Sequence, residues 1–358
     1  MAEKLTSRER FARIYQHKDA DRIPIIDYPW ESTIERWKRE GMPENIDWVN
    51  YFGTDYVFSF RPDNSPRYKY KIVEETEDYI IETSQWGVTY KSWKYKTSKP
   101  EFLDFKITDR ESWKEAKERM TPSRDRIDWE HLKNIYKQNG KGLGAWISAG
   151  LWFGFDITHA WFIGTERVLI AMIEDPDWCL DIFTRELEVS LASLDMIWDE
   201  GYHFDEVNWP DDMGYKNNLF FSVQKYVEIL KPLHKKVVEW ARQKGVYLRF
   251  HSCGDINPLL PHFYEIGLDC ISPLEIKAGM NPIELKKKFG DRMTFHGGIN
   301  AMLWNDTEAI TEEIKRVIPI MKENGGYIFG SDHSIPDSVS MENFKYILSL
   351  VKTFGSYD

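Results

Sequence analysis

The sequence predicts a (β/α)8 TIM barrel with an antiparallel β insert after the second strand. Eight short runs of β-branched or apolar residues are bounded by turn residues, and from the third run onward they alternate with stretches of helical periodicity. Strands that alternate with helices form a parallel sheet, and eight such strands are typical of a closed barrel. The 358 residues are enough for one barrel with insertions.

The first predicted element is a helix near Ser7, because Thr6 and Glu9 have the spacing of a capping box before an amphipathic run. The predicted strands then cover residues 23–27, 56–60, 143–148, 204–208, 246–250, 268–272, 293–296 and 327–330. The predicted helices that alternate with them cover residues 166–175, 178–200, 222–244, 259–266, 282–289 and 307–323.

Three runs between the second and third predicted strands break this pattern. Residues 68–75, 78–84 and 86–93 alternate apolar and polar side chains, as antiparallel strands do. We expect an insert over about residues 66–100 at the catalytic end of the barrel, where it could act as a lid. No repeat or linker is visible, so we expect a single domain over residues 1–358.

The composition argues against several classes of protein. The chain has 47 Lys and Arg against 58 Asp and Glu, a net charge of −11, and no basic block that would bind nucleic acid. The longest uncharged run, residues 142–155, is shorter than the roughly 20 apolar residues of a membrane span. The N-terminus is charged where a secretory signal is apolar, and three cysteines give no disulfide framework. We therefore expect a cytoplasmic protein with no nucleic-acid or membrane partner.

A candidate metal site follows the predicted fifth strand. His251 and Cys253 are two residues apart and so project the same way, and an imidazole beside a thiol can bind zinc. A packed strand end is the alternative for such a pair. Three other strands end in further candidates, namely Glu275, His296, and Asp332 with His333. Because a barrel builds its active site at the C-terminal ends of its strands, we expect these side chains to gather there, with His296 and Asp332 contacting substrate.

The predicted fourth strand ends in a second polar group. Asp211 and Asp212 are candidate catalytic residues, because paired carboxylates suit acid–base chemistry, while a solvated loop is the alternative. Asn208 and Tyr215 are candidates for binding substrate at the same opening. Trp146, near the end of the predicted third strand, is expected either to form an apolar wall there or to belong to the core.

Taken together, these segments resemble the uroporphyrinogen decarboxylase family in its broad sense. The resemblance extends from about Leu5 to Tyr346 and is carried by RIPI, YFGTDYV, WGVTY, DDMGYKNNLFFS, KGVYLRFHSCGDI, IGLDCISPLE, GDRMTFHGGIN and GGYIFGSDHSIP. It implies a (β/α)8 barrel with one of two chemistries. One is decarboxylation of uroporphyrinogen, and the other is zinc-dependent methyl transfer between a corrinoid and a substrate or thiol.

The decarboxylase branch of the family has two segments that this chain lacks. Its members resemble one another in an Arg-rich segment after the first strand, which grips substrate carboxylates, and in an Asp-containing stretch near the second strand. Here those places read DYPWE at residues 27–31 and FSFRP at residues 58–62. A porphyrinogen with many carboxylates would meet few cations, so repulsion disfavours it. Decarboxylation of a porphyrinogen or smaller acid, with Asp211 or Asp212 as proton donor, is the alternative activity.

The methyltransferase branch is similar in its zinc pattern, which is His-x-Cys followed far downstream by another Cys. His251 and Cys253 match the pair, but at the third position Asp332 or His333 replaces the cysteine, with Glu275 as a further ligand. We favour His333 as the ligand, with Asp332 orienting it. Such a harder ligand set leaves zinc a stronger Lewis acid for oxygen.

This branch implies a corrinoid-dependent methyltransferase as the function. The substrate would be a methoxylated or N-methylated small molecule, and its methyl group would pass to the cobalt of a corrinoid carried by a separate partner protein. The implied cofactors are therefore zinc and a borrowed corrinoid, or cobalamin. A ligand-binding barrel that has lost its metal is the non-enzymatic alternative.

Overall fold

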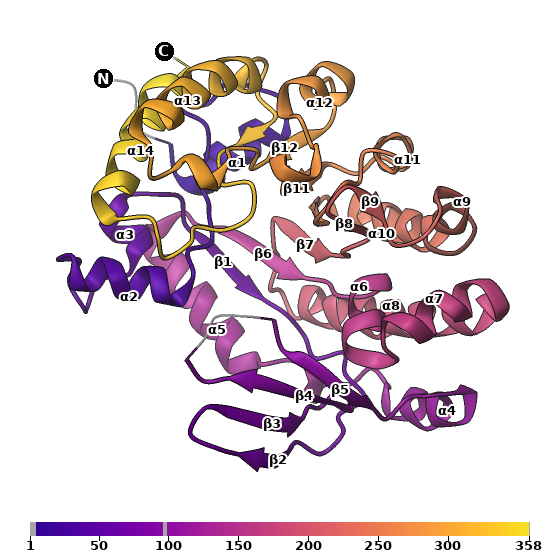
Figure 1. The fold of residues 1–358 in the computed structure, drawn as a ribbon. Helices are drawn as coiled ribbons and strands as arrows, with labels where there is room; N and C mark the ends of the chain where they lie inside the picture. Colours follow the sequence, from indigo (N-terminus) through magenta and orange to yellow (C-terminus); the bar gives the residue numbers. More distant parts are fainter. Residues whose placement is uncertain (1–4, 96–98, 358) are drawn as a thin grey trace.

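The computed structural model describes residues 5–95 and 99–357, which form a mixed α/β fold (Figure 1). A parallel sheet of seven strands forms its centre, helices surround that sheet, and a smaller antiparallel sheet lies to one side. The first helix, α1 (Ser7–Tyr15), begins with the predicted capping box between Thr6 and Glu9. Within the described ranges, no helix combines the length and the apolar character that crossing a membrane requires.

The central sheet has the strand order β1-β6-β7-β10-β11-β12-β13, and neighbouring strands are parallel. Residues 23–27 take the eighth position without forming a regular strand. Ile25 bridges Phe329 just after β13, and the N–H of Asp55, just before β1, donates to the carbonyl of Ile25. The fold is therefore TIM-like. Its strands are β1 (Val57–Phe60), β6 (Trp146–Gly150), β7 (Glu206–Pro210), β10 (Tyr247–His251), β11 (Cys270–Ser272), β12 (Thr294–His296) and β13 (Tyr327–Ile328).

Helices cover the outside of this sheet (Figure 1). The six predicted helices correspond to α7, α8, α9 with α10, α11, α12 and α13, and a π-helical turn, Tyr226–Leu230, joins α9 to α10. The helices after α1 are α2 (Glu31–Arg39), α3 (Trp48–Phe52), α4 (Arg110–Arg119), α5 (Trp129–Gln138), α6 (Phe155–Ile157), α7 (Thr165–Glu174), α8 (Pro176–Asp199), α9 (Val223–Lys225), α10 (Lys231–Lys244), α11 (Leu260–Ile266), α12 (Pro282–Phe289), α13 (Thr307–Lys322) and α14 (Met341–Phe354).

The antiparallel sheet lies in the chain between β1 and β6. Its order is β2-β3-β4-β5, with β2 (Lys71–Glu75), β3 (Tyr79–Thr83), β4 (Val88–Trp93) and β5 (Glu101–Phe105). The first three strands match the predicted alternating runs, whereas β5 lies beyond the predicted limit of the insert at residue 100. The sheet packs against the segment after β6 through aromatic rings, including Trp86 on Trp152 and Phe102 on Trp161, with centroids 5.7 and 5.3 Å apart.

Helix α1 closes the N-terminal end of the barrel, and Trp146 belongs to this end. Trp146 is 2% exposed and stacks on Phe11 and Tyr15 of α1 and on Tyr247 of β10. The prediction that Trp146 forms an apolar wall at the mouth of the barrel is therefore wrong. Strand β6 begins at Trp146 rather than at residue 143, so this side chain lies at the start of the strand and not near its C-terminal end. The alternative expectation, a core residue, agrees with the structure.

Candidate functional site

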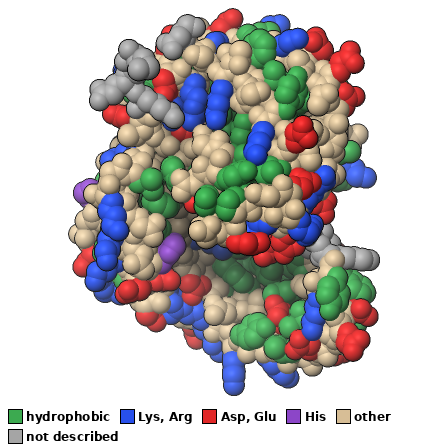
Figure 2. All heavy atoms as spheres, turned by 90° about the vertical axis from the view of Figure 1, so that its left-hand side faces the viewer, with side chains coloured by type: hydrophobic (Ala, Val, Ile, Leu, Met, Phe, Trp, Pro, Cys, Tyr) green, Lys and Arg blue, Asp and Glu red, His purple; other side chains and the backbone are tan. Residues whose placement is uncertain are grey.

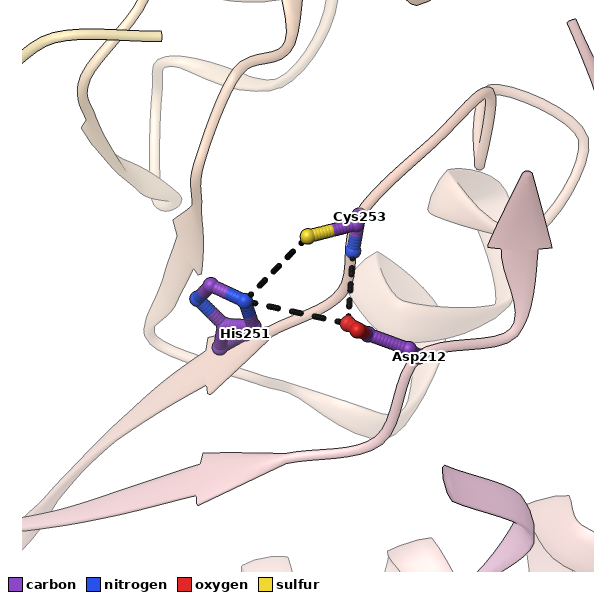
Figure 3. Close-up of side chains that lie close together, drawn as sticks. All are labelled: Asp212, His251 and Cys253. Atoms are coloured by element: carbon purple, nitrogen blue, oxygen red, sulfur yellow. Dashed lines mark hydrogen bonds and ion pairs between the residues drawn. The ribbon is translucent and has the colours of Figure 1, made fainter. Parts of the chain in front are cut away.

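Three side chains that can bind a metal converge where two neighbouring strands end (Figure 3). His251 ends β10 and Cys253 follows it, while Asp212 comes just after β7. His251 Nε2 lies 3.4 Å from Cys253 Sγ and 3.7 Å from Asp212 Oδ1. Strands β7 and β10 are paired with Pro210 opposite His251, so the two loops leave the sheet at the same level.

The separations within this group are those of ligands to one metal ion. The candidate ligand atoms of Asp212, His251 and Cys253 all lie within 4.8 Å of one another. A tetrahedral zinc ion with bonds of about 2.0 Å to nitrogen and about 2.3 Å to sulfur holds those two atoms roughly 3.5 Å apart. Asp212 is held in place because the backbone N–H of Cys253 donates to its Oδ1 at 2.8 Å. One nitrogen, one sulfur and one oxygen donor therefore fit an ion and leave a fourth position for another group.

Asp212 and Cys253 line a space of about 250 Å³, which we call the outer hollow. Two predicted ligands, Glu275 and His333, line the same hollow, although they do not belong to the group of three. Glu275 Oε2 accepts the backbone N–H of Gly254 at 2.7 Å, and His333 is exposed. The remaining lining residues are Lys99, His159, Gly214, Tyr215, Lys216, Phe220 and Gly254.

A larger space of about 520 Å³, which we call the inner cavity, shares His251 with this site. The imidazole of His251 thus lies between the two spaces, since Asp212 and Cys253 line only the outer one. Figure 2 shows the surface hollowed between the inserted sheet, at the bottom, and the barrel above it, with hydrophobic side chains in the depth. The inner cavity is lined by Ile26, Asp27, Tyr28, Trp48, Val49, Asp55, Val57, Ser59, Ser148, Asn208, Pro210, Arg249 and His251.

His251, at the end of β10, and Cys253, just after it, differ in how readily they give up a proton. Burial lowers the pKa of His251 despite the nearby carboxylate of Asp212, which leaves a neutral imidazole with a free lone pair. Burial raises the pKa of the Cys253 thiol well above its usual range, and the charges of Asp212 and Glu275 raise it further. A metal ion that binds here must therefore displace the thiol proton.

Asp211, predicted as a catalytic partner of Asp212, lines neither space. It is fully buried, and its Oδ1 accepts the N–H of Asp156 at 2.8 Å while its Oδ2 lies 3.3 Å from His234 Nε2. Burial raises the pKa of Asp211 well above its usual range and lowers that of His234 to about 3. Neighbouring residues on an extended segment point to opposite sides, so Asp212 faces the hollow and Asp211 faces the packed wall behind it.

The predicted substrate-binding residues are divided between the cavities and the core. Asn208 lines the inner cavity and Tyr215 the outer hollow. His296 is buried, donates from Nε2 to a backbone carbonyl at 3.2 Å and accepts at Nδ1 from Arg249 at 3.4 Å, and burial lowers its pKa to about 3. Asp332 is fully buried and its Oδ1 accepts a backbone N–H at 2.9 Å. His296 and Asp332 therefore support the strand ends and line neither space.

Sequence reasoning missed several charged residues that line the two spaces, among them Arg249 and Lys99. Arg249 on β10 is 2% exposed, lies 2.9 Å from Glu206 Oε1 through Nη2, and donates from Nη1 to the Tyr28 hydroxyl at 3.1 Å. The signal for Arg249 was available, because a residue two places before His251 on a strand projects to the same side. Lys99 belongs to the segment between β4 and β5, and no local pattern indicates that it reaches the outer hollow.

Comparison with known proteins gives both a family match and a structural neighbour. A family model described as uroporphyrinogen decarboxylase (URO-D) matches residues 160–354, more than half of the chain. A solved structure described as a methyltransferase from Methanosarcina mazei has a TM-score of 0.66 at 15% identity, and the match covers 98% of this chain and 99% of that chain. At this identity the likeness concerns the fold alone.

Curated relatives named uroporphyrinogen decarboxylase match a shorter part. The protein from Helicobacter pylori (strain P12) is 26% identical over 149 residues, which is 40% of this chain and 39% of that protein. The protein from Vesicomyosocius okutanii subsp. Calyptogena okutanii (strain HA) is 24% identical over 153 residues, or 41% and 40%. The chain thus spans about two fifths of the length of these two relatives.

Proposed function

The chain belongs to the uroporphyrinogen decarboxylase family, and on this premise we propose that it is a metal-dependent methyltransferase. In this proposal it takes a methyl group from a methoxylated or N-methylated small molecule and passes it to a corrinoid on a separate protein. The observation that carries the proposal is the group of Asp212, His251 and Cys253, whose ligand atoms lie within 4.8 Å of one another. The methyltransferase from Methanosarcina mazei, with a TM-score of 0.66 over nearly the whole chain, supports it at the level of fold.

Zinc suits these donors, because it accepts imidazole, thiolate and carboxylate ligands in one tetrahedral site. When bound, zinc supplies a Lewis acid that polarises an oxygen or nitrogen of the substrate. Asp212 would be a ligand in this proposal, rather than the acid–base catalyst that the sequence predicts. The backbone N–H of Cys253 keeps the carboxylate of Asp212 turned toward His251. The neutral imidazole of His251 and the thiol of Cys253 would supply the other two donors.

The fourth position is open to Glu275, His333 or the substrate itself. We keep His333 as the favoured protein ligand, because it lines the outer hollow with Asp212 and Cys253. Asp332 is fully buried and its carboxylate accepts a backbone N–H, which suits a residue that orients the loop bearing His333. Glu275 already holds the N–H of Gly254 through one carboxylate oxygen.

The corrinoid would be borrowed from a partner protein that docks at the mouth of the barrel. When present, it supplies a low-valent cobalt that accepts the methyl group. The inserted sheet contributes Lys99 to the outer hollow, and this contact supports a role for the sheet as a cover over the mouth of a single domain. Tyr215 and Phe220, whose ring centroids lie 5.1 Å apart, provide an aromatic wall to the same hollow.

Decarboxylation is the second candidate function, and the names of the curated relatives favour it. A substrate with many carboxylates would need several free cations around it. Among the described residues, Arg249 is the arginine that lines the inner cavity, and it is already paired with Glu206 at 2.9 Å. We therefore rank this activity below methyl transfer.

The metal content of the purified protein tests whether Asp212, His251 and Cys253 bind an ion. We expect about one zinc ion per purified chain by elemental analysis, and loss of it in the double variant His251→Ala, Cys253→Ala, because a four-ligand site that loses two ligands binds weakly. Asp212→Asn should weaken binding as well. The variant His262→Ala serves as a control, because His262 lies outside both spaces beside Lys231 and Glu265. Unchanged zinc in the double variant would reject the site.

Activity separates the two functions. The reduced corrinoid protein with a methoxylated aromatic compound should give methylated corrinoid, seen by its visible absorbance, and His251→Ala should abolish this change. Uroporphyrinogen should release no carbon dioxide. Carbon dioxide release on the order of once per second or faster would instead establish the decarboxylase.

A further inference from the structure

We propose that the inner cavity binds an uncharged small molecule that both donates and accepts a hydrogen bond at Asn208. Two features of the cavity carry this inference. Asn208 presents a buried amide oxygen without a partner, and the charged groups of the wall already have ion-pair or hydrogen-bond partners within the protein. The use of the bound molecule as a methyl donor rests on the proposed function, whereas its binding does not.

Asn208 lies in the middle of β7 and its side chain lines the inner cavity. Its Oδ1 is buried and has no hydrogen-bond partner among the residues that the structure describes. An amide side chain carries one acceptor oxygen and two donor hydrogens, and leaving a buried polar group unpaired costs free energy. A ligand with a planar amide or a hydroxyl group offers the missing donor and acceptor together.

Two of the charged groups on the cavity wall have their counter-charges inside the protein. Asp55 is fully buried and forms ion pairs with Arg10 and, at 2.6 Å, with Arg22. Arg249 lies 2.9 Å from Glu206 on the neighbouring strand. Neither Asp55 nor Arg249 therefore offers a free charge to a ligand.

Asp27 and His251, which also line the cavity, are engaged as well. The carboxylate of Asp27 accepts the N–H and hydroxyl of Ser331 at 2.6 and 2.8 Å and the N–H of Tyr28 at 2.7 Å. The imidazole Nε2 of His251 lies 3.4 Å from Cys253 Sγ and 3.7 Å from Asp212 Oδ1, so it is already engaged with these two groups. An anionic ligand would lose its hydration on entry and find no unpaired cation on the wall. A cationic ligand would find at Asp27 a carboxyl group whose oxygens already accept three hydrogen bonds. A neutral ligand avoids this cost.

The position of the cavity connects it with the proposed chemistry. His251 lines the inner cavity, while its Nε2 faces Asp212 and Cys253 of the outer hollow. A molecule anchored at Asn208 therefore lies on one side of the imidazole, and the metal-binding atoms lie on the other. His251 is the residue of the metal-binding group that lines the inner cavity, so a ligand anchored at Asn208 would approach that group beside its imidazole.

Three probes of equal size and shape test the charge rule: benzamide is neutral, benzoate is an anion and benzamidine is a cation at pH 7. We expect isothermal titration of the full chain, with a chelator present, to give an affinity for benzamide at least tenfold higher than for either ion. Trp48 lines the cavity, so benzamide should also change the tryptophan fluorescence, and this change should be lost in Trp48→Phe.

Two substitutions of Asn208 test the anchor. Asn208→Leu keeps the size of the side chain and should weaken benzamide binding about tenfold or more, and Asn208→Asp should reverse the order so that benzamidine binds best. The control Asn343→Leu changes an asparagine on α14, outside the inner cavity, and should leave benzamide affinity unchanged. Thermal melts of each variant confirm that it is folded.

Several results would overturn the inference. Benzoate binding most tightly would show that Arg249 is free to hold an anion, and equal binding of benzamide by wild type and Asn208→Leu would remove the anchor. A fluorescence change that persists in Trp48→Phe would place the probe elsewhere. Because no metal or corrinoid is present, these outcomes are independent of methyl transfer. If benzamide binds as expected but methoxylated aromatic compounds give no methylated corrinoid in the activity assay, the proposed function is rejected and this binding site is retained.

Discussion

Glu206 and Glu186 are both fully buried, yet their surroundings shift their pKa values in opposite directions. Glu206, on β7, would have its pKa raised by burial, but Arg249 at 2.9 Å and the hydroxyls of Tyr15 and Ser148 bring it below the usual value. Glu186, on α8, accepts the N–H of Gly154 and the hydroxyl of Thr158 at 2.9 and 2.8 Å, and burial raises its pKa to about 8.

The difference shows that a counter-charge, and not burial alone, decides whether a carboxylate stays ionised in this molecule. The floor of the inner cavity has that counter-charge in Arg249. The wall behind Asp212, His251 and Cys253 has no such counter-charge beside Asp211 among the described residues. There the pKa of Asp211 is raised by burial and by the neighbouring carboxylates of Asp156, Asp212 and Glu186. The floor of the inner cavity is therefore a network of paired charges around Glu206 and Arg249. The wall around Asp211 and Glu186 contains carboxyl groups whose raised pKa values favour the protonated form.

Removing Arg249, the counter-charge of Glu206, should lower the stability of the protein more than any other change considered below. Arg249→Met leaves Glu206 buried and unpaired, so we expect the free energy of unfolding to fall by about 3–5 kcal/mol in urea denaturation. The double variant Arg249→Met, Glu206→Gln should recover much of this loss, because no uncompensated charge remains. A loss of under about 1 kcal/mol in the single variant would mean that the pair does not decide the state of Glu206.

The pH dependence of stability tests the other glutamate. The folded pKa of Glu186, about 8, lies above its ordinary value of 4.5, so its stabilising contribution is complete below pH 4.5 and is lost as the pH rises through 8. Glu186→Gln stays neutral, and the free energy of unfolding relative to wild type should rise by about 2 kcal/mol between pH 6 and pH 8. Parallel curves for the two proteins, measured by urea denaturation across this range, would contradict the assignment.

The hydroxyl groups around Glu206 should matter less than its arginine. Tyr15→Phe removes a hydrogen bond of 2.5 Å to Glu206 Oε2, and we expect a loss of about 1–2 kcal/mol from the free energy of unfolding. Tyr247→Phe is the matched control, because its ring stacks on Tyr15 with centroids 4.5 Å apart while its hydroxyl makes no hydrogen bond to Glu206 in the described structure. Equal losses in both variants would assign the effect to packing.

The smallest effect is expected at the surface, one residue from Glu206. Asp205 is paired with Arg8 at 2.8 Å, but the Arg8 side chain is 59% exposed and water screens the interaction. Arg8→Ala should therefore change the free energy of unfolding by less than about 1 kcal/mol, and 1 M salt should reduce the difference further. A loss comparable to that of Arg249→Met would break the distinction between exposed and buried counter-charges.

Much of the fold could be predicted because its signals are local. Helix α12 is predicted and found at Pro282–Phe289, since Asn281 caps its start and proline suits the first turn. Residues 23–27 were predicted as a strand and form only a bridge at Ile25, because their pairing depends on Phe329 and Asp55, which are remote in sequence. Strand β5 was missed for the same reason, as its alternation becomes meaningful only once β4 is beside it.

The candidate site follows the same division. His251 and Cys253 could be placed together because they are two residues apart at the end of a strand, where the alternation of side chains still predicts a common direction. The approach of Asp212 depends on the register between β7 and β10, which the sequence does not state. Asp211 and Asp332 are buried rather than exposed to a cavity, and this depends on which side of each loop packs against the core. The proposed roles of Glu275 and His333 stay predictions.

The pairing of Ile25 with Phe329 has a consequence for the synthesis of the chain. The roughly 300 residues between them take about 15–60 s to translate at about 5–20 residues per second. During that interval the segment holding Ile23, Ile25 and Ile26 has been made but its partner after β13 has not. Nascent chains that stall before Phe329 should therefore expose an aggregation-prone apolar segment beside an unpaired sheet edge. We expect chaperones to bind such chains.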